Sequence, residues 1–134
     1  MTKKDQNPPL EKWQQFTGAS YKLHNLGRPA VFLLPSKKLR GRVEKELHAF
    51  LIKHFEAYTT TLIPSFGFWR DRRKSIIYDE CRQYEVSFVG KEKIPLLLKK
   101  LAGIAGRINE ECIYFKAGQY TCLIAPQTRN RKSK

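Results

Sequence analysis

Residues 59–89 read TTTLIPSFGFWRDRRKSIIYDECRQYEVSFV, two runs rich in β-branched and aromatic residues on either side of a short basic segment. This composition is typical of two long strands joined as a hairpin, with Arg70–Lys74 as the turn. Proline cannot donate a backbone hydrogen bond, so Pro64 indicates that the first strand lies at a sheet edge or contains a bulge. Further strands and helices are predicted on both sides of this hairpin.

One strand and one helix are predicted before the hairpin. Ala30–Leu34 is wholly apolar and is closed by Pro35, which is typical of a buried strand. Apolar residues then recur at steps of three and four from Leu39 to Tyr58, which predicts a helix. We expect Ser36 to act as its N-cap and the helix to end near Ala57.

A second helix and a final hairpin are predicted after it. Gly90 breaks the strand, and apolar residues keep helical spacing from Ile94 to Ile108. Gly106 and Asn109 suit the end of this helix. Residues 111–116 and 120–125 alternate in hydrophobicity around a short turn, which favours a terminal hairpin.

The order strand, helix, strand, strand, helix, strand predicts an α+β fold. Its plan is ferredoxin-like (βαββαβ): an antiparallel sheet with two helices on one face, here with an extra C-terminal hairpin strand. The 134 residues suffice for one core. We expect a basic, partly disordered extension at 1–28, a single domain at 29–125 and a disordered basic tail at 126–134. The predicted core contains Val31, Leu33, Leu47, Phe50, Leu51, Leu97, Leu98 and Leu101, and we expect Trp13, Phe16 and Tyr21 to pack on the sheet or a helix.

Positive charge is concentrated in four stretches of this chain. The net charge is +14, and all of it lies in residues 1–28, 36–42, 70–74 and 126–134. Charge held apart from a neutral scaffold is typical of a surface that meets a polyanion. We therefore expect a non-catalytic nucleic-acid-binding domain that contacts the phosphate backbone, with DNA or RNA and single or double strand left open. The predicted phosphate contacts are Lys37, Lys38, Arg40, Arg42, Arg70, Arg72, Arg73 and Lys74, and Trp69 is predicted to stack on a base.

Two other functions are compatible with the sequence. If Trp69 pairs with Ser75, even-numbered residues of both strands share one face, where Glu80 and Arg82 interrupt an apolar stripe. Together with Tyr84 they are candidates for an enzyme or small-ligand pocket, because a partly dry site shifts pKa values. The alternatives are a bulge at Pro64 that turns them to solvent, or a structural ion pair. The third alternative is a homodimeric assembly protein.

Several other chemistries lack support in the sequence. The three histidines have no metal-ligand spacing, and nucleotide-binding glycine motifs are absent, so we expect neither a metal nor a cofactor. No apolar run is long enough for a membrane span, so a cytoplasmic protein is expected. Cys81, Cys112 and Cys122 are predicted to be reduced core thiols, with a Cys112–Cys122 bridge as the alternative.

Overall fold

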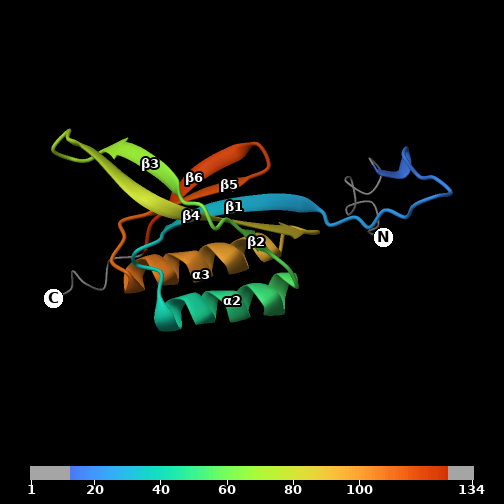
Figure 1. The fold of residues 1–134 in the computed structure, drawn as a ribbon, viewed down its shortest axis with the longest axis horizontal. Coiled ribbons are helices and arrows are strands. Elements are labelled where there is room, and N and C mark those ends of the chain that lie inside the picture. The colour runs from blue at the N-terminus through green and yellow to red at the C-terminus, as the bar shows by residue number, and fades with distance from the viewer. Residues whose placement is uncertain (1–12, 127–134) are drawn as a thin grey trace.

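The computed structural model describes residues 13–126, which form an α+β fold (Figure 1). The predicted class, an antiparallel sheet with two helices, is confirmed. In chain order the elements are β1 (Arg28–Pro35), α2 (Gly41–Phe55), β2 (Thr59–Thr60), β3 (Ser65–Arg70), β4 (Ile76–Phe88), α3 (Lys93–Arg107), β5 (Ile113–Ala117) and β6 (Tyr120–Ile124).

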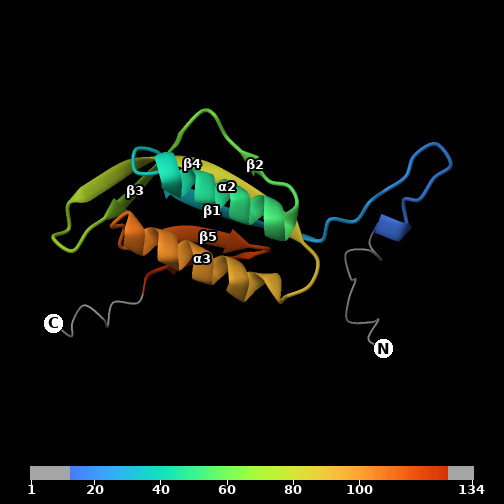
Figure 2. The same ribbon diagram turned by 90° about the horizontal axis from the view of Figure 1, so that it is seen from below.

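All strand pairs of the sheet are antiparallel, in the order β2-β4-β1-β5-β6. Strand β3 also pairs with β4, so the predicted first strand of the long hairpin is divided into β2 and β3. Both helices cover the same face of the sheet, and the opposite face is open (Figures 1 and 2). The predicted terminal hairpin, β5 with β6, is present at one edge. The finer ferredoxin-like designation stays a prediction.

The core lies between this covered face and the two helices. Ala30, Phe32 and Leu34 of β1 point into it and are buried. Leu47, Leu51, Leu97 and Leu101 from the helices are fully buried as predicted, while Phe50 and Leu98 pack at its border. The prediction for Val31 and Leu33 is wrong: strand side chains alternate, so both lie on the open face and are partly exposed.

The long hairpin is paired two residues away from the predicted register. Trp69 pairs with Ile77 instead of Ser75, whereas β2 keeps the predicted register with Thr60 opposite Tyr84. Between β2 and β3, residues 61–64 bulge out, and Leu62 and Ile63 are exposed. The expected bulge at Pro64 therefore exists, and it absorbs the two extra residues. Since the shift is even, the predicted faces of β3 and β4 are unchanged.

The first helix starts later than predicted, and the second ends as predicted. Residues 36–39 form a turn on Pro35, so the N-cap of α2 is Arg40 instead of Ser36, and Glu56 with φ +67° ends the helix. At the end of α3, Asn109 adopts φ +58°, and the amide of Glu110 donates to the carbonyl of Ala105. This is a Schellman motif, in which asparagine tolerates the left-handed conformation.

Residues near the amino terminus do not join the core. Trp13, Phe16 and Tyr21 are exposed, so their predicted packing is wrong, and the segment from residue 13 leads away from the sheet (Figure 1). The predicted disorder of the end segments falls largely on residues 1–12 and 127–134, which lie outside the described residues. Among residues 13–126 no helix is long and apolar enough to cross a membrane.

The cysteines differ from the prediction of three core thiols. All are free, and only Cys81 is buried; Cys112 is partly exposed and Cys122 is exposed. The alternative bridge between Cys112 and Cys122 is not formed. Cys122 pairs with Phe115 across the terminal hairpin and lies in the edge strand β6, which explains its exposure.

Candidate functional site

On the face of β4 that the helices cover, side chains are buried toward the end of the strand and exposed toward its start. Tyr84, Val86 and Phe88 lie under the helices, and Tyr84 is only 2% exposed. Tyr78, on the same face six residues earlier, is 59% exposed. The hairpin of β3 and β4 continues past the ends of both helices, so neither α2 nor α3 covers its outer part (Figures 1 and 2).

Three aromatic rings stand on this uncovered part, and we call them the aromatic platform: Phe66, Phe68 and Tyr78. Phe66 is 53% exposed and Phe68 is 67% exposed. The ring centroids of Phe68 and Tyr78 are 5.4 Å apart with planes inclined by 23°, and those of Phe66 and Tyr78 are 6.1 Å apart. Phe68 pairs directly with Tyr78 in the register, and such cross-strand contacts fix the rings.

The turn that joins β3 to β4 carries four exposed cations. The carboxylate of Asp71 accepts hydrogen bonds from the amides of Arg73 and Ser75, each at 2.9 Å, and Lys74 adopts φ +68°. Asp71 therefore supports the turn while its neighbours face solvent. The exposed cations Arg70, Arg72, Arg73 and Lys74 are called the tip cluster below. The guanidinium of Arg70 also donates to the carbonyl of Lys74 at 3.0 Å.

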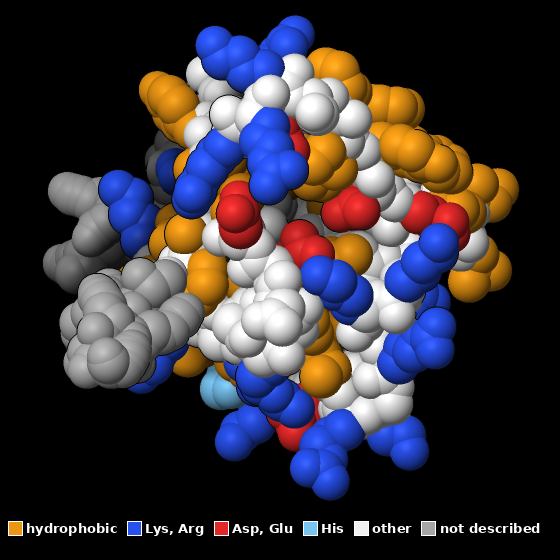
Figure 3. All heavy atoms as spheres, turned by 90° about the vertical axis from the view of Figure 1, so that its left-hand side faces the viewer, with side chains coloured by type: hydrophobic (Ala, Val, Ile, Leu, Met, Phe, Trp, Pro, Cys, Tyr) orange, Lys and Arg blue, Asp and Glu red, His pale blue; other side chains and the backbone are white. Residues whose placement is uncertain are grey.

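The second predicted group of cations lies before and at the start of α2, at the same end of the molecule (Figures 1 and 2). Lys37, Arg40 and Arg42 are exposed. Lys38 is engaged in contacts inside the protein: its ammonium forms an ion pair with the carboxylate of Glu110 at 2.7 Å and donates a hydrogen bond to the carbonyl of Asn109. From this end, a band of hydrophobic side chains lies beside Lys and Arg side chains (Figure 3).

Arg82 pairs with a residue that the sequence did not indicate, and not with Glu80. Arg82 forms an ion pair with Glu44 of α2 at 2.8 Å, and this hydrogen bond raises the pKa of the guanidinium. Burial raises the pKa of the neighbouring Tyr84 hydroxyl. Glu80 lies opposite Phe66, at the inner border of the platform, and is partly exposed. Arg82 and Glu44 thus join the hairpin to α2 at the rim of the core.

Trp69 lies on the other face of the hairpin. Adjacent residues of a strand alternate, so its ring points away from the platform, and it is 44% exposed. Its immediate neighbour Arg70 lies on the platform face, opposite Ile76.

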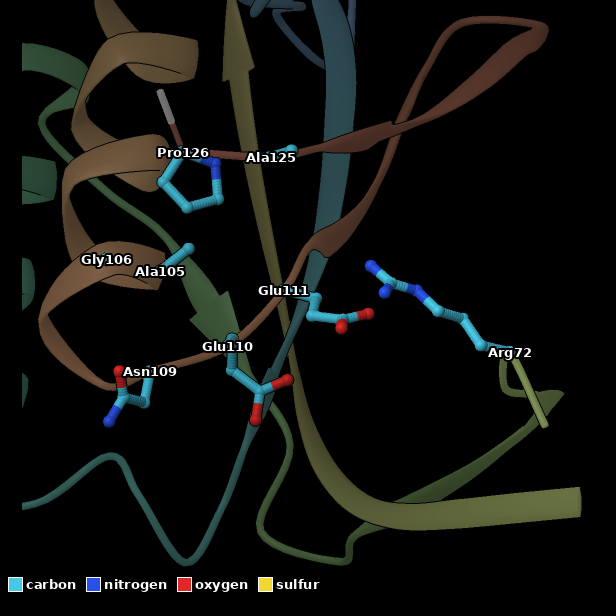
Figure 4. Close-up of a pocket in the computed structure, with 8 residues that line it drawn as sticks. All are labelled: Arg72, Ala105, Gly106, Asn109, Glu110, Glu111, Ala125 and Pro126. Atoms are coloured by element: carbon cyan, nitrogen blue, oxygen red, sulfur yellow. The ribbon is translucent and has the colours of Figure 1, made fainter. Parts of the chain in front are cut away.

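An open cavity of about 470 Å³ lies between the tip cluster and the end of α3. The Schellman turn directs Glu110 and Glu111 to it, and the side chain of Arg72 extends toward Glu111 (Figure 4). Ala105, Gly106 and Pro126 form an apolar wall. Among residues 13–126, no group of three or more histidine, cysteine or acidic side chains could hold a metal ion.

Comparison with known proteins finds similarity in structure and not in sequence. No family model matches the sequence, and no curated protein sequence matches it. A solved structure of a phage SAM lyase in complex with S-methyl-5'-thioadenosine is similar with a TM-score of 0.56 and 10% sequence identity, covering 81% of this chain and 96% of the lyase chain. At this identity the similarity shows the fold alone.

From the sequence, Phe66 and Phe68 were considered for base stacking together with Trp69, but only Trp69 was predicted, and Tyr78 was not included. The signal was available, because the three residues alternate on one face beside the basic turn. Their exposure could not be inferred from that pattern, since the same alternation continues through Tyr84 and Phe88 into the core.

Proposed function

We propose that this protein binds nucleic acid, without catalysis, through the basic end that carries the tip cluster and the cations before α2. The observation that supports this most is the exposed tip cluster next to an exposed aromatic surface on the same hairpin. Lys and Arg side chains that replace condensed counterions supply most of non-specific affinity for nucleic acid.

Not all predicted cations contribute equally in this proposal. Lys38 is paired with Glu110, and Arg72 faces the carboxylate of Glu111. Arg70, Arg73 and Lys74 are therefore the main phosphate contacts of the hairpin, supported by Lys37, Arg40 and Arg42.

The experiment is fluorescence anisotropy with labelled single- and double-stranded DNA and RNA at about 50 mM salt, where non-specific affinity is visible. The variant Arg70→Gln/Arg73→Gln/Lys74→Gln should bind more weakly. A matched variant, Arg28→Gln/Lys53→Gln/Lys91→Gln, removes the same charge from exposed residues at the opposite end and should lose less affinity. Absence of binding to every probe by the unmodified protein would refute the proposal.

A second candidate function is the binding of a small ligand in the cavity lined by Glu110 and Glu111. Its volume is within the range of ligand pockets. The similar phage lyase was solved with S-methyl-5'-thioadenosine, which makes that nucleoside thioether the first probe. Calorimetric titration should then detect binding that the variant Glu110→Gln/Glu111→Gln loses; no heat with either protein would exclude this probe as the ligand.

A further inference from the structure

We propose that the aromatic platform binds unpaired bases, so that the preferred ligand is single-stranded nucleic acid. This inference rests on the proposed function and specifies the ligand of the same basic end. It assigns the stacking role to Phe66, Phe68 and Tyr78, in place of Trp69.

The first argument is the exposure of the rings. An aromatic side chain gains most from burial, yet these three rings stand on a stretch of the covered face that α2 and α3 leave free. Leu62 and Ile63 of the bulge and Ile76 of β4 are exposed as well. Exposed apolar side chains gathered on one hairpin in this number are typical of a binding site.

The charge around the platform indicates which partner covers it. Arg70 lies on the platform face two residues beyond Phe68, and Arg73 and Lys74 follow in the turn. A second copy of this chain would bring the same cations and a net charge of +14 against them. A polyanion with flat apolar groups complements both the cations and the rings.

The shape of the platform favours a single strand. In a duplex the faces of the bases are covered by their neighbours, and only base edges and phosphates are accessible. In a single strand the faces are free to stack on aromatic side chains, which raises affinity about 5- to 150-fold per base. The adjacent cations then hold the backbone of the same strand.

The test compares the affinities of a single strand and of its duplex for Phe68→Ala/Tyr78→Ala. We expect the single strand to bind the unmodified protein at least 10-fold more tightly than the duplex, and the variant to lose most of this preference. Duplex affinity and the salt dependence should change little, because no cation is removed. Phe68→Trp should retain the preference for the single strand, and Phe68→Leu, which keeps an apolar side chain without an aromatic face, should lose part of it while remaining folded.

Trp69→Ala is the matched control, because it removes an exposed ring from the other face of the same strand. It should leave the single-strand affinity unchanged. Equal affinity of the unmodified protein for both forms, or a loss caused by Trp69→Ala and not by Phe68→Ala/Tyr78→Ala, would overturn this inference and leave the proposed function intact. Sedimentation that shows a dimer dissociated by Phe68→Ala/Tyr78→Ala, with unchanged single-strand affinity, would also overturn it. Absence of binding to every nucleic acid would overturn the proposed function itself.

Discussion

Removal of the hairpin cations should change how affinity depends on salt. In the variant Arg70→Gln/Arg73→Gln/Lys74→Gln, three exposed cations are lost while Asp71, whose carboxylate supports the turn, is kept. Each phosphate contact contributes a slope of about −0.7 to the logarithmic salt dependence for a single strand, so the slope should flatten by about 2. Between ~50 and ~200 mM salt, the unmodified protein should then lose about 20-fold more affinity than the variant.

The assay is fluorescence anisotropy at several salt concentrations with one labelled oligonucleotide. The matched variant Arg28→Gln/Lys53→Gln/Lys91→Gln should change the slope by less than about 0.5, because its cations lie at the other end of the molecule. Circular dichroism should show that both variants keep the fold. Equal flattening by both variants would refute the reasoning, since the charge would then act through the net field and not through local contacts.

Three further predictions concern the fold and its ionisable groups. Leu97→Ala should cost about 2 to 5 kcal/mol in chemical denaturation, because Leu97 of α3 is fully buried in the core; a loss under about 1 kcal/mol would contradict the packing of α3 on the sheet. A double-mutant cycle on Arg82 and Glu44 should give a coupling of at most about 1 kcal/mol, since both side chains are partly exposed, and a coupling above about 3 kcal/mol would indicate a dry site instead. Burial, aided by the charge of Asp79, raises the pKa of Cys81 to about 11, so Cys81 is a neutral thiol at pH 8. A disulfide reagent should therefore modify the exposed Cys122 and leave the buried Cys81 largely unmodified. Equal modification rates of the two cysteines would contradict the burial of Cys81.

The elements of the fold were predictable because local patterns determine them. Apolar spacing located both helices, and Asn109 marked the end of α3, where it adopts the left-handed conformation that the residue type tolerates. The start of α2 was predicted too early, because Ser36 looked like an N-cap while residues 36–39 instead form a turn on Pro35. The choice between a turn and a first helical turn depends on tertiary contacts such as that of Lys38 with Glu110, which lie far apart in the sequence.

The candidate site was only partly predictable for a related reason. The position of the basic turn could be read directly, since charge runs are visible in the sequence. The partner of Arg82 could not, because Glu44 is separated from it by 38 residues. The register of the hairpin failed because the bulge at residues 61–64 adds two residues on one strand, and no local pattern fixed that number.

The relation between core and platform explains how one sequence pattern serves two purposes. Alternating apolar residues in β4 bury their side chains only where a helix lies above them, and α2 begins at Gly41, close to where Glu44 binds Arg82. Beyond that ion pair the same alternation exposes Tyr78 next to Phe66 and Phe68. The length of the helix therefore decides where packing ends and where an aromatic surface becomes available to a ligand. Because the platform is outside the core, its rings can be replaced with little loss of stability, which lets binding and folding be tested separately.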